Sequence, residues 1–194
     1  MELTHREDEM HWYALQLRPR FEKIVSMHLQ SKGYEEYLPV YRSKRRWSDR
    51  VKEISLPLFP GYIFCRFDMN QRLPVLVIPG VMSIVSFGGN AIPVSEQEIL
   101  AVQTIVNSGY PYEPSAYTTV GRRVTIERGP LRGLEGIVAE PKKNYRLIVS
   151  VEMLRRSVSV ELDWDCVTLV PAKETAAPVA GFSQGQALHH HHKR

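Results

Sequence analysis

The chain has 194 residues, a mass of 22.3 kDa, a formal net charge of +4 and only two cysteines. This length allows one domain or two small ones, and the mildly basic balance permits contact with nucleic acid without requiring it. Two distant cysteines exclude a disulfide framework, no apolar run is long enough to span a membrane, and the polar stretch Met1 to His11 is unlike a secretory signal, so we expect a cytoplasmic protein.

The first half of the chain mixes strand and helix patterns. Residues 11–17 alternate weakly and carry aromatic side chains, which predicts a strand. Residues 21–33 place apolar side chains at helical spacing and end in glycine, which predicts a helix. Residues 58–67 form an aromatic strand that opens on Pro-Gly, and residues 81–87 indicate another strand. Residues 95–109 begin with a Ser-Glu capping box, continue as an apolar stripe and end in glycine, which predicts a second helix.

The second half of the chain is typical of β-structure. Residues 109–119 are rich in Pro, Tyr, Ser and Thr and have no period, which predicts a linker. Several short strand patterns follow between residues 120 and 170 and predict a small antiparallel barrel. Residues 171–194 lack an apolar pattern, which predicts a disordered tail. Its run His189 to His192 is interpreted as a purification-tag remnant, with metal chelation as the alternative.

A basic stretch runs from Arg42 to Lys52 and has Trp47 within it and only Asp49 as a close offset. Phosphate contacts need such cations, and an aromatic ring can stack on an unpaired base. The stretch therefore predicts nucleic-acid contact, and a solvated charged loop is the alternative.

No pattern of an enzyme is present in the sequence. There is no phosphate-binding glycine loop, no Ser-His-Asp signature and no Cys/His metal spacing. Asp163 and Asp165 are carboxylates near a predicted strand end and have no general-acid context. We therefore expect no catalysis, no metal site and no cofactor.

Two segments in the right order carry a resemblance to a known family. Trp12-Tyr13 and Phe21-Glu22, followed by Leu58-Phe59-Pro60-Gly61-Tyr62-Ile63-Phe64, resemble the N-terminal domain of the NusG family. The segment 121–170, with Gly129-Pro130-Leu131-Arg132-Gly133, resembles a KOW motif. Arg46 to Arg50 followed by Pro57 to Tyr62 is similar to the specialised UpxY- and RfaH-like paralogues.

The resemblance implies an α+β fold with two domains. Residues 11–108 would form the NusG-type αβ domain, an antiparallel sheet with flanking helices. Residues 109–119 would be the linker, residues 120–170 an SH3-like KOW β-barrel, and residues 171–194 the tail. The density of β-branched residues favours a barrel over refolding into helices, which propensity alone leaves open.

The resemblance also implies a function in transcription. Such a factor binds the clamp helices of bacterial RNA polymerase together with upstream or non-template DNA, and suppresses pausing or termination during elongation. The implied polymerase-binding residues are Phe59, Tyr62, Phe64, Ile84 and Phe87, with a purely core role as the alternative. The implied DNA-binding residues are Arg18, Arg20, Arg42, Lys44, Arg45, Arg46, Trp47, Arg50 and Lys52.

The KOW domain would recruit a further partner. In the family a loop here contacts Rho or a small-subunit ribosomal protein, and it aligns with Met153, Leu154, Arg155 and Arg156. The usual aromatic residue is replaced by Leu154, and the two arginines can also favour RNA. The alternatives are a KOW-type RNA-binding or ribosome-associated protein and a Rho-assisting termination factor. A monomer is typical of the family.

Overall fold

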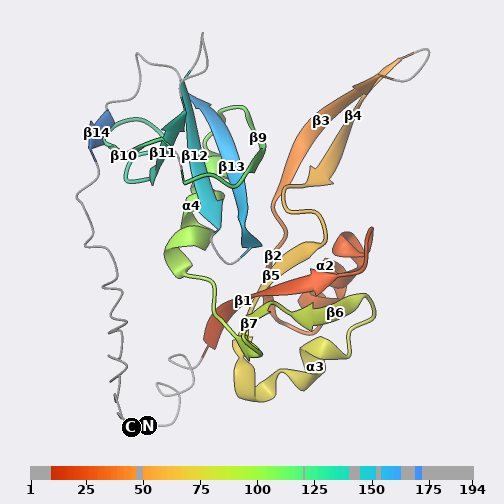
Figure 1. Ribbon diagram of the computed structural model, residues 1–194. Helices are drawn as coiled ribbons and strands as arrows, with labels where there is room; N and C mark the ends of the chain where they lie inside the picture. Colours follow the sequence, from red (N-terminus) through yellow and green to blue (C-terminus); the bar gives the residue numbers. More distant parts are fainter. Residues whose placement is uncertain are drawn as a thin grey trace, which may run out of the picture.

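The computed structural model describes residues 10–46, 50–119, 121–139, 145–151, 154–162 and 169–171. An N-terminal sheet with short helices occupies one end of the molecule, and a C-terminal sheet lies at the other end (Figure 1). Helix α4 (Glu96–Asn107) joins the two parts. The α+β fold class expected from the sequence is confirmed, with an antiparallel sheet and few helices first and a strand-rich region second.

The N-terminal sheet has four strands in the order β2-β5-β1-β6, and neighbouring strands are antiparallel. The strands are β1 (Met10–Leu17), β2 (Glu35–Tyr37), β5 (Tyr62–Asp68) and β6 (Val81–Ile84). Along β5 the side chains alternate between two hydrophobic clusters, with Phe64 in one and Ile63 and Cys65 in the other. The sheet is therefore covered on both faces.

Helix α2 (Glu22–Ser31) covers one of these faces. Val25 and Leu29 are fully buried in the cluster that contains Ile63. The Gly61 N–H donates to the buried Glu22 carboxylate at 3.0 Å and fastens the first turn of the helix to the Pro-Gly turn before β5. The chain turns away at Gly33, whose φ of 78° favours glycine.

The connection from β5 to β6 contains a 3-10 turn, Met69–Gln71, and the short helix α3 (Leu73–Leu76). The expected single strand over residues 81–87 is wrong. β6 ends at Ile84, and the Val85 N–H still bonds to the Ala14 carbonyl of β1 at 2.8 Å. After Val85 the chain leaves β1, and β7 (Ser86–Phe87) pairs with β8 (Asn90–Ala91) as a separate hairpin. A break of this kind depends on the partner strand, which a local pattern does not reveal.

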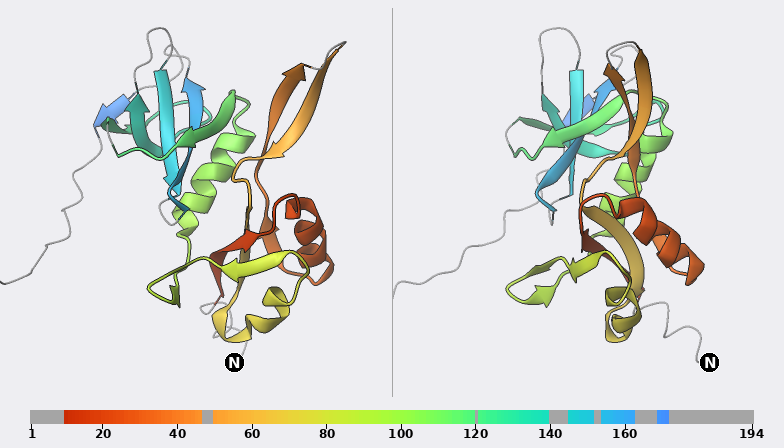
Figure 2. Two further views of the ribbon diagram at one scale, coloured as in Figure 1. Left: turned by 45° about the vertical axis from the view of Figure 1, so that its right-hand side comes forward. Right: turned by 90° about the vertical axis from the view of Figure 1, so that its right-hand side faces the viewer.

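Helix α4 (Glu96–Asn107) starts with the predicted capping box, in which the Ser95 hydroxyl accepts from the backbone and Glu98 bonds back to the Ser95 N–H. Ile99, Val102 and Ile105 are its buried residues. They share one hydrophobic cluster with N-terminal and C-terminal side chains. The helix also runs beside β12 (Tyr145–Val151) of the C-terminal sheet (Figure 2). It therefore connects the cores of the two parts.

The C-terminal sheet has six antiparallel strands in the order β14-β10-β11-β12-β13-β9. They are β9 (Tyr112–Ala116), β10 (Arg122–Ile126), β11 (Glu135–Ala139), β12 (Tyr145–Val151), β13 (Arg156–Leu162) and β14 (Leu169–Pro171). Segment 109–119 therefore differs from the linker expected there. Five of its residues form β9, which pairs with β13 over its whole length, and the Glu161 N–H donates to the Pro111 carbonyl at 3.0 Å.

A side-chain hydrogen bond also connects β9 to the N-terminal part. The Tyr112 hydroxyl donates to the Val40 carbonyl at 2.7 Å. Val40 begins β3 (Val40–Arg46), which pairs with β4 (Val51–Pro57) in a long antiparallel hairpin. Burial raises the pKa of Tyr112, and the nearby Arg42 partly opposes that shift. The hydroxyl therefore stays protonated as a donor at neutral pH.

None of the described helices is long and apolar enough to cross a membrane. Residues 172–194, which hold nearly all of the predicted tail and the His189 to His192 run, lie outside the described residues, as do Asp163 and Asp165.

The free cysteine Cys65 is buried in the N-terminal sheet, and its thiol is expected to react slowly. Burial, with the Glu36 and Glu35 carboxylates second, raises the pKa of its thiol to about 12 from an ordinary value of 9.0. The neutral thiol is favoured in the folded state, so this stabilisation is complete below pH 9 and is lost as pH rises towards 12. In a Cys166→Ser variant at pH 8, we expect iodoacetamide to label the native chain at least about 100-fold more slowly than the urea-unfolded chain. Equal rates would contradict this burial.

Candidate functional site

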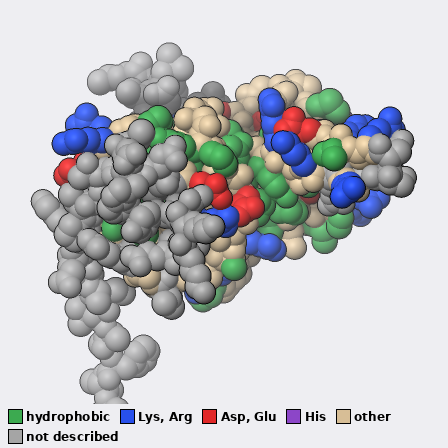
Figure 3. Space-filling model, turned by 90° about the horizontal axis from the view of Figure 1, so that it is seen from above, with side chains coloured by type: hydrophobic (Ala, Val, Ile, Leu, Met, Phe, Trp, Pro, Cys, Tyr) green, Lys and Arg blue, Asp and Glu red, His purple; other side chains and the backbone are tan. Residues whose placement is uncertain are grey.

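The β3–β4 hairpin stands away from the N-terminal sheet and projects beside the C-terminal sheet (Figure 1). Its strands and turn carry six cationic residues, whereas Glu53 is the only acidic residue on its two strands. Seen from above, Lys and Arg side chains crowd this end of the molecule (Figure 3). The charge predicted from the sequence is thus concentrated on one projecting element.

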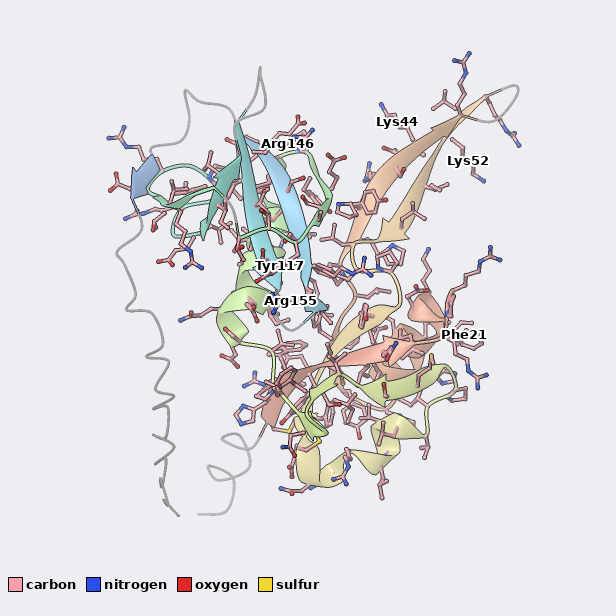
Figure 4. All side chains as sticks on the ribbon, in the orientation of Figure 1. Phe21, Lys44, Lys52, Tyr117, Arg146 and Arg155 are labelled. Carbon is pink, nitrogen blue, oxygen red and sulfur yellow. The ribbon has the colours of Figure 1, made fainter. Side chains whose placement is uncertain are left out.

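The strand register distributes these cations over both faces of the hairpin. Arg46 lies opposite Val51, and Arg45 lies opposite Lys52. Because side chains alternate along a strand, Lys44 and Lys52 point to opposite sides, as Figure 4 shows. The hairpin can therefore contact phosphates on either side of its plane.

Few acidic side chains of the hairpin balance the positive charges of its Lys and Arg residues. Arg42 and Glu53 approach to 3.7 Å, but both side chains are largely exposed, and exposed pairs of this kind contribute little. The predicted residues Lys44, Arg46, Arg50 and Lys52 are exposed as well. The structure describes the Arg45 backbone only, and Trp47 lies outside the described residues.

Arg18 and Arg20 are exposed but belong to another part of the surface. They lie in the turn just before Phe21, which Figure 4 shows well away from the hairpin tip. Arg20 has a φ of 69°, an unusual conformation for a residue with a side chain, and the Arg18 N–H donates to the Gly80 carbonyl at 2.9 Å. The structure therefore does not bring these two arginines together with the hairpin.

The five predicted polymerase-binding residues fall into different environments. Phe59 and Phe64 are 2% and 0% exposed and meet edge to face, with ring centroids 5.6 Å apart. Tyr62 is partly buried against the same cluster, whereas Ile84 packs on the opposite face of the sheet. Phe87 is 78% exposed on the β7–β8 hairpin. In this conformation, Tyr62 and Phe87 offer aromatic surface to a partner, and Phe59 and Phe64 form the layer beneath.

Register reveals neighbours of Tyr62 that the sequence analysis missed. Gln16 pairs with Tyr62 on one side and with Ser83 on the other, so the three side chains share a face. The Ser83 hydroxyl donates to the Gln16 side-chain oxygen at 3.2 Å. Only the strand pairing joins these positions, and a single sequence does not show which strands are neighbours.

The residues of the predicted partner loop in the C-terminal sheet also differ in burial. Leu154 is buried in the hydrophobic cluster, and Met153 lies outside the described residues. Arg155 has a φ of 49°, and its guanidinium lies 5.0 Å from the centre of the Tyr117 ring, as Figure 4 shows. Arg156 is exposed at the start of β13. The two arginines are thus the surface part of this set.

Two groups of ion pairs connect neighbouring elements at the surface. Arg66 of β5 reaches Glu96 at 3.1 Å and Glu35 at 3.5 Å, so it links the start of α4 with the N-terminal sheet through two exposed carboxylates. Arg146 of β12 reaches Glu113 at 2.8 Å and Glu161 at 2.9 Å, which links three adjacent strands.

Within the described ranges, no group of three or more His, Cys, Asp or Glu side chains is placed to hold a metal ion.

Comparison with known proteins finds relatives that match this chain over most of its length. Residues 10–103 match the family model described as transcription termination factor NusG. The chain is 31% identical over 176 residues to the transcription termination/antitermination protein NusG of Buchnera aphidicola subsp. Baizongia pistaciae, with 80% of this chain and 94% of that protein covered. The chain belongs to the NusG family.

A second relative agrees with this membership. The NusG of Pseudomonas aeruginosa is 29% identical over 175 residues, with 82% of this chain and 98% of that protein covered. A solved structure described as "Domain interaction in Thermotoga maritima NusG" aligns at a TM-score of 0.49 and 23% identity, over 80% of this chain and 94% of that one. As a NusG-family member, the protein is a transcription factor.

Proposed function

We propose that this NusG-family protein binds elongating RNA polymerase in the cytoplasm and suppresses pausing or termination, as a specialised paralogue. The hairpin would hold upstream or non-template DNA. The observation that carries the proposal is the projecting β3–β4 hairpin, which presents cations on both faces in a chain of this family. A strand of DNA beside the enzyme would be held by phosphate contacts that tolerate any sequence.

The polymerase contact in this proposal uses exposed aromatic surface. Phe87 and Tyr62 are the accessible aromatic members of the predicted set, and each anchor that becomes fully buried contributes about 1.5–3 kcal/mol. An apolar helical surface such as the polymerase clamp helices would bury both rings. Phe59 and Phe64 would then support the contact from within the fold, whereas Ile84 is half-buried like Tyr62 but packs on the opposite face of the sheet.

The further partner of the C-terminal sheet is proposed to be a small-subunit ribosomal protein or Rho, and the chain to be a monomer. Arg155 and Arg156 are the exposed members of the predicted loop. The proposed role needs no catalysis and no cofactor.

The test is binding of the labelled full chain to a reconstituted elongation complex, together with Phe87→Ala and Tyr62→Ala. Loss of one hydrophobic anchor should weaken the affinity about 10-fold or more, because about 1.4 kcal/mol corresponds to a factor of ten. Saturable binding that also shortens pauses would support the proposal. Binding that neither variant weakens would remove the aromatic contact, and no binding with retention on ribosomes would favour a ribosome-associated role. Met82→Ala, another exposed apolar residue, is the matched control.

A further inference from the structure

Glu22 is the one buried charged side chain in the part of the chain that the structure describes. The other buried polar side chains there are those of Ser157 and Ser159, which carry no charge. Burying a carboxylate costs free energy unless hydrogen bonds satisfy it, so an apolar residue would suit this position better if it served packing alone. The burial of Glu22 therefore points to a role besides packing.

The Glu22 carboxylate holds the turn that leads into β5. It accepts a hydrogen bond at 3.0 Å from the Gly61 N–H, which belongs to the peptide group between Pro60 and Gly61. The Tyr62 N–H donates to the Phe59 carbonyl at 3.1 Å, so residues 59–62 form a β-turn with that peptide group at its centre. Proline at the second position and a φ of 83° at the glycine are typical of a type II turn.

The central peptide group decides the type of this turn. Types I and II differ by a half-rotation of that group, which reverses the direction of its N–H and moves φ of the third residue from about +80° to about −90°. Proline at the second position is compatible with both types. Because Glu22 accepts from this N–H in one direction only, its hydrogen bond favours the type II form over the type I form.

The backbone that carries Glu22 is itself fixed. Glu22 lies in the first turn of α2, where the unpaired N–H groups of a helix favour a carboxylate. Phe21 packs so closely on Gly80 that a Cβ added at Gly80 would lie 2.5 Å from the ring. The Arg18 N–H also donates to the Gly80 carbonyl at 2.9 Å. The carboxylate is therefore held in place before any partner binds.

The residue that follows the turn is Tyr62, one of the two accessible aromatic residues proposed to contact polymerase. The Gly61 carbonyl accepts from the Leu17 N–H at 2.8 Å, and Tyr62 then pairs with Gln16 of β1. These contacts and the bond to Glu22 together set where β5 begins. They therefore also set the direction in which the Tyr62 side chain leaves the sheet.

We propose that Glu22 is a positioning residue for the polymerase contact, because it holds the turn in the type II form and so orients Tyr62. This inference rests on the proposed function. In a variant without the acceptor, type I and type II turns would both be populated, and only the fraction with the type II turn would bind at full strength. If that fraction falls to about one fifth, the affinity falls about 5-fold.

The test is a double-mutant cycle on the affinity of the labelled full chain for the reconstituted elongation complex. Glu22→Leu, which keeps a side chain of similar size but no acceptor, should weaken binding at least about 5-fold. The same change in a Tyr62→Ala background should weaken binding by less than about 2-fold, because the ring that Glu22 positions is absent. In a Phe87→Ala background, whose ring lies on the β7–β8 hairpin, the full weakening should remain.

Three further measurements separate positioning from a loss of stability. Glu22→Gln retains a side-chain carbonyl oxygen that can accept from Gly61, so it should keep most of the affinity that Glu22→Leu loses. Val25→Ala removes fully buried atoms from the same helix and should lower stability without weakening binding. Hydrogen exchange of the Gly61 amide, followed by NMR, should be at least about 10-fold faster in Glu22→Leu than in the wild type.

The outcomes distinguish this inference from the proposed function. Absence of wild-type binding overturns the proposed function and the positioning role with it. If the wild type binds and Tyr62→Ala weakens that binding, three results overturn the positioning role alone. These are no effect of Glu22→Leu, an equal effect of Glu22→Leu with and without the Tyr62 ring, and a loss no larger than that of Val25→Ala. Unchanged exchange at Gly61 would likewise show that Glu22 does not hold the turn.

Discussion

Phe64→Ala is expected to lower the free energy of unfolding by about 3–5 kcal/mol, as a large-to-small change in a packed core does. The ring is fully buried, stacks on Tyr37 with centroids 6.4 Å apart and meets Phe59 edge to face. Removing it leaves a cavity between the N-terminal sheet and the cluster that includes α4. Urea denaturation of the variant and the wild type, fitted with a common slope, measures the difference.

Phe87→Ala is the matched control for this experiment. Because that ring is 78% exposed, its loss should change the free energy of unfolding by no more than about 0.5 kcal/mol. A loss at Phe64 below 1 kcal/mol, similar to the control, would mean that Phe64 is not a core residue. Phe64 would then be a residue that contacts the polymerase directly.

Neutralising the hairpin is expected to have the largest effect on DNA binding. The quadruple change Lys44→Gln, Arg46→Gln, Arg50→Gln and Lys52→Gln should weaken binding to a short DNA duplex at least about 100-fold at 50 mM salt, because it removes most of the phosphate contacts. The slope of log affinity against log salt should fall by about 3.6 if all four residues contact phosphates. Anisotropy titrations at several salt concentrations give both values.

Two variants control for charge in general. Glu53→Gln removes the only carboxylate of the hairpin strands and should strengthen duplex binding, since the repulsion and the pairing with Arg42 both disappear. Arg128→Gln with Arg132→Gln should leave duplex affinity nearly unchanged. If the hairpin variant binds duplex DNA as tightly as the wild type does, the hairpin is only a solvated charged element.

Local patterns predicted helices α2 and α4 and several of the strands, but not the short helix α3. The capping box at Ser95 and Glu98 and the glycine after α2 act within a few residues of themselves, so they can be recognised in a single sequence. Strand β9 was missed because Pro114 and the polar residues around it have no strand period. What makes that segment a strand is its pairing with β13, whose residues lie 40 to 48 positions later in the sequence, from Ala116 opposite Arg156 to Tyr112 opposite Val160.

The candidate site shows the same division. The charge of the hairpin is a property of one continuous stretch, and the structure places that stretch on one projecting element. The aromatic set is spread over several strands, and register and burial separate Phe64, Ile84 and Phe87 into different surroundings.

The pairing of β9 with β13 also decides where the C-terminal part can be cut. A fragment that starts at residue 120 would lack β9 and would leave the backbone groups along one side of β13 without their native partners. Exposed strand edges of this kind pair readily with other chains, so such a fragment should self-associate as its concentration rises. A fragment that starts at residue 111 retains β9 and the Pro111 carbonyl, and it should stay monomeric. The smallest C-terminal fragment that can be expressed as a monomer therefore begins within residues 109–119, the segment whose composition predicts a linker.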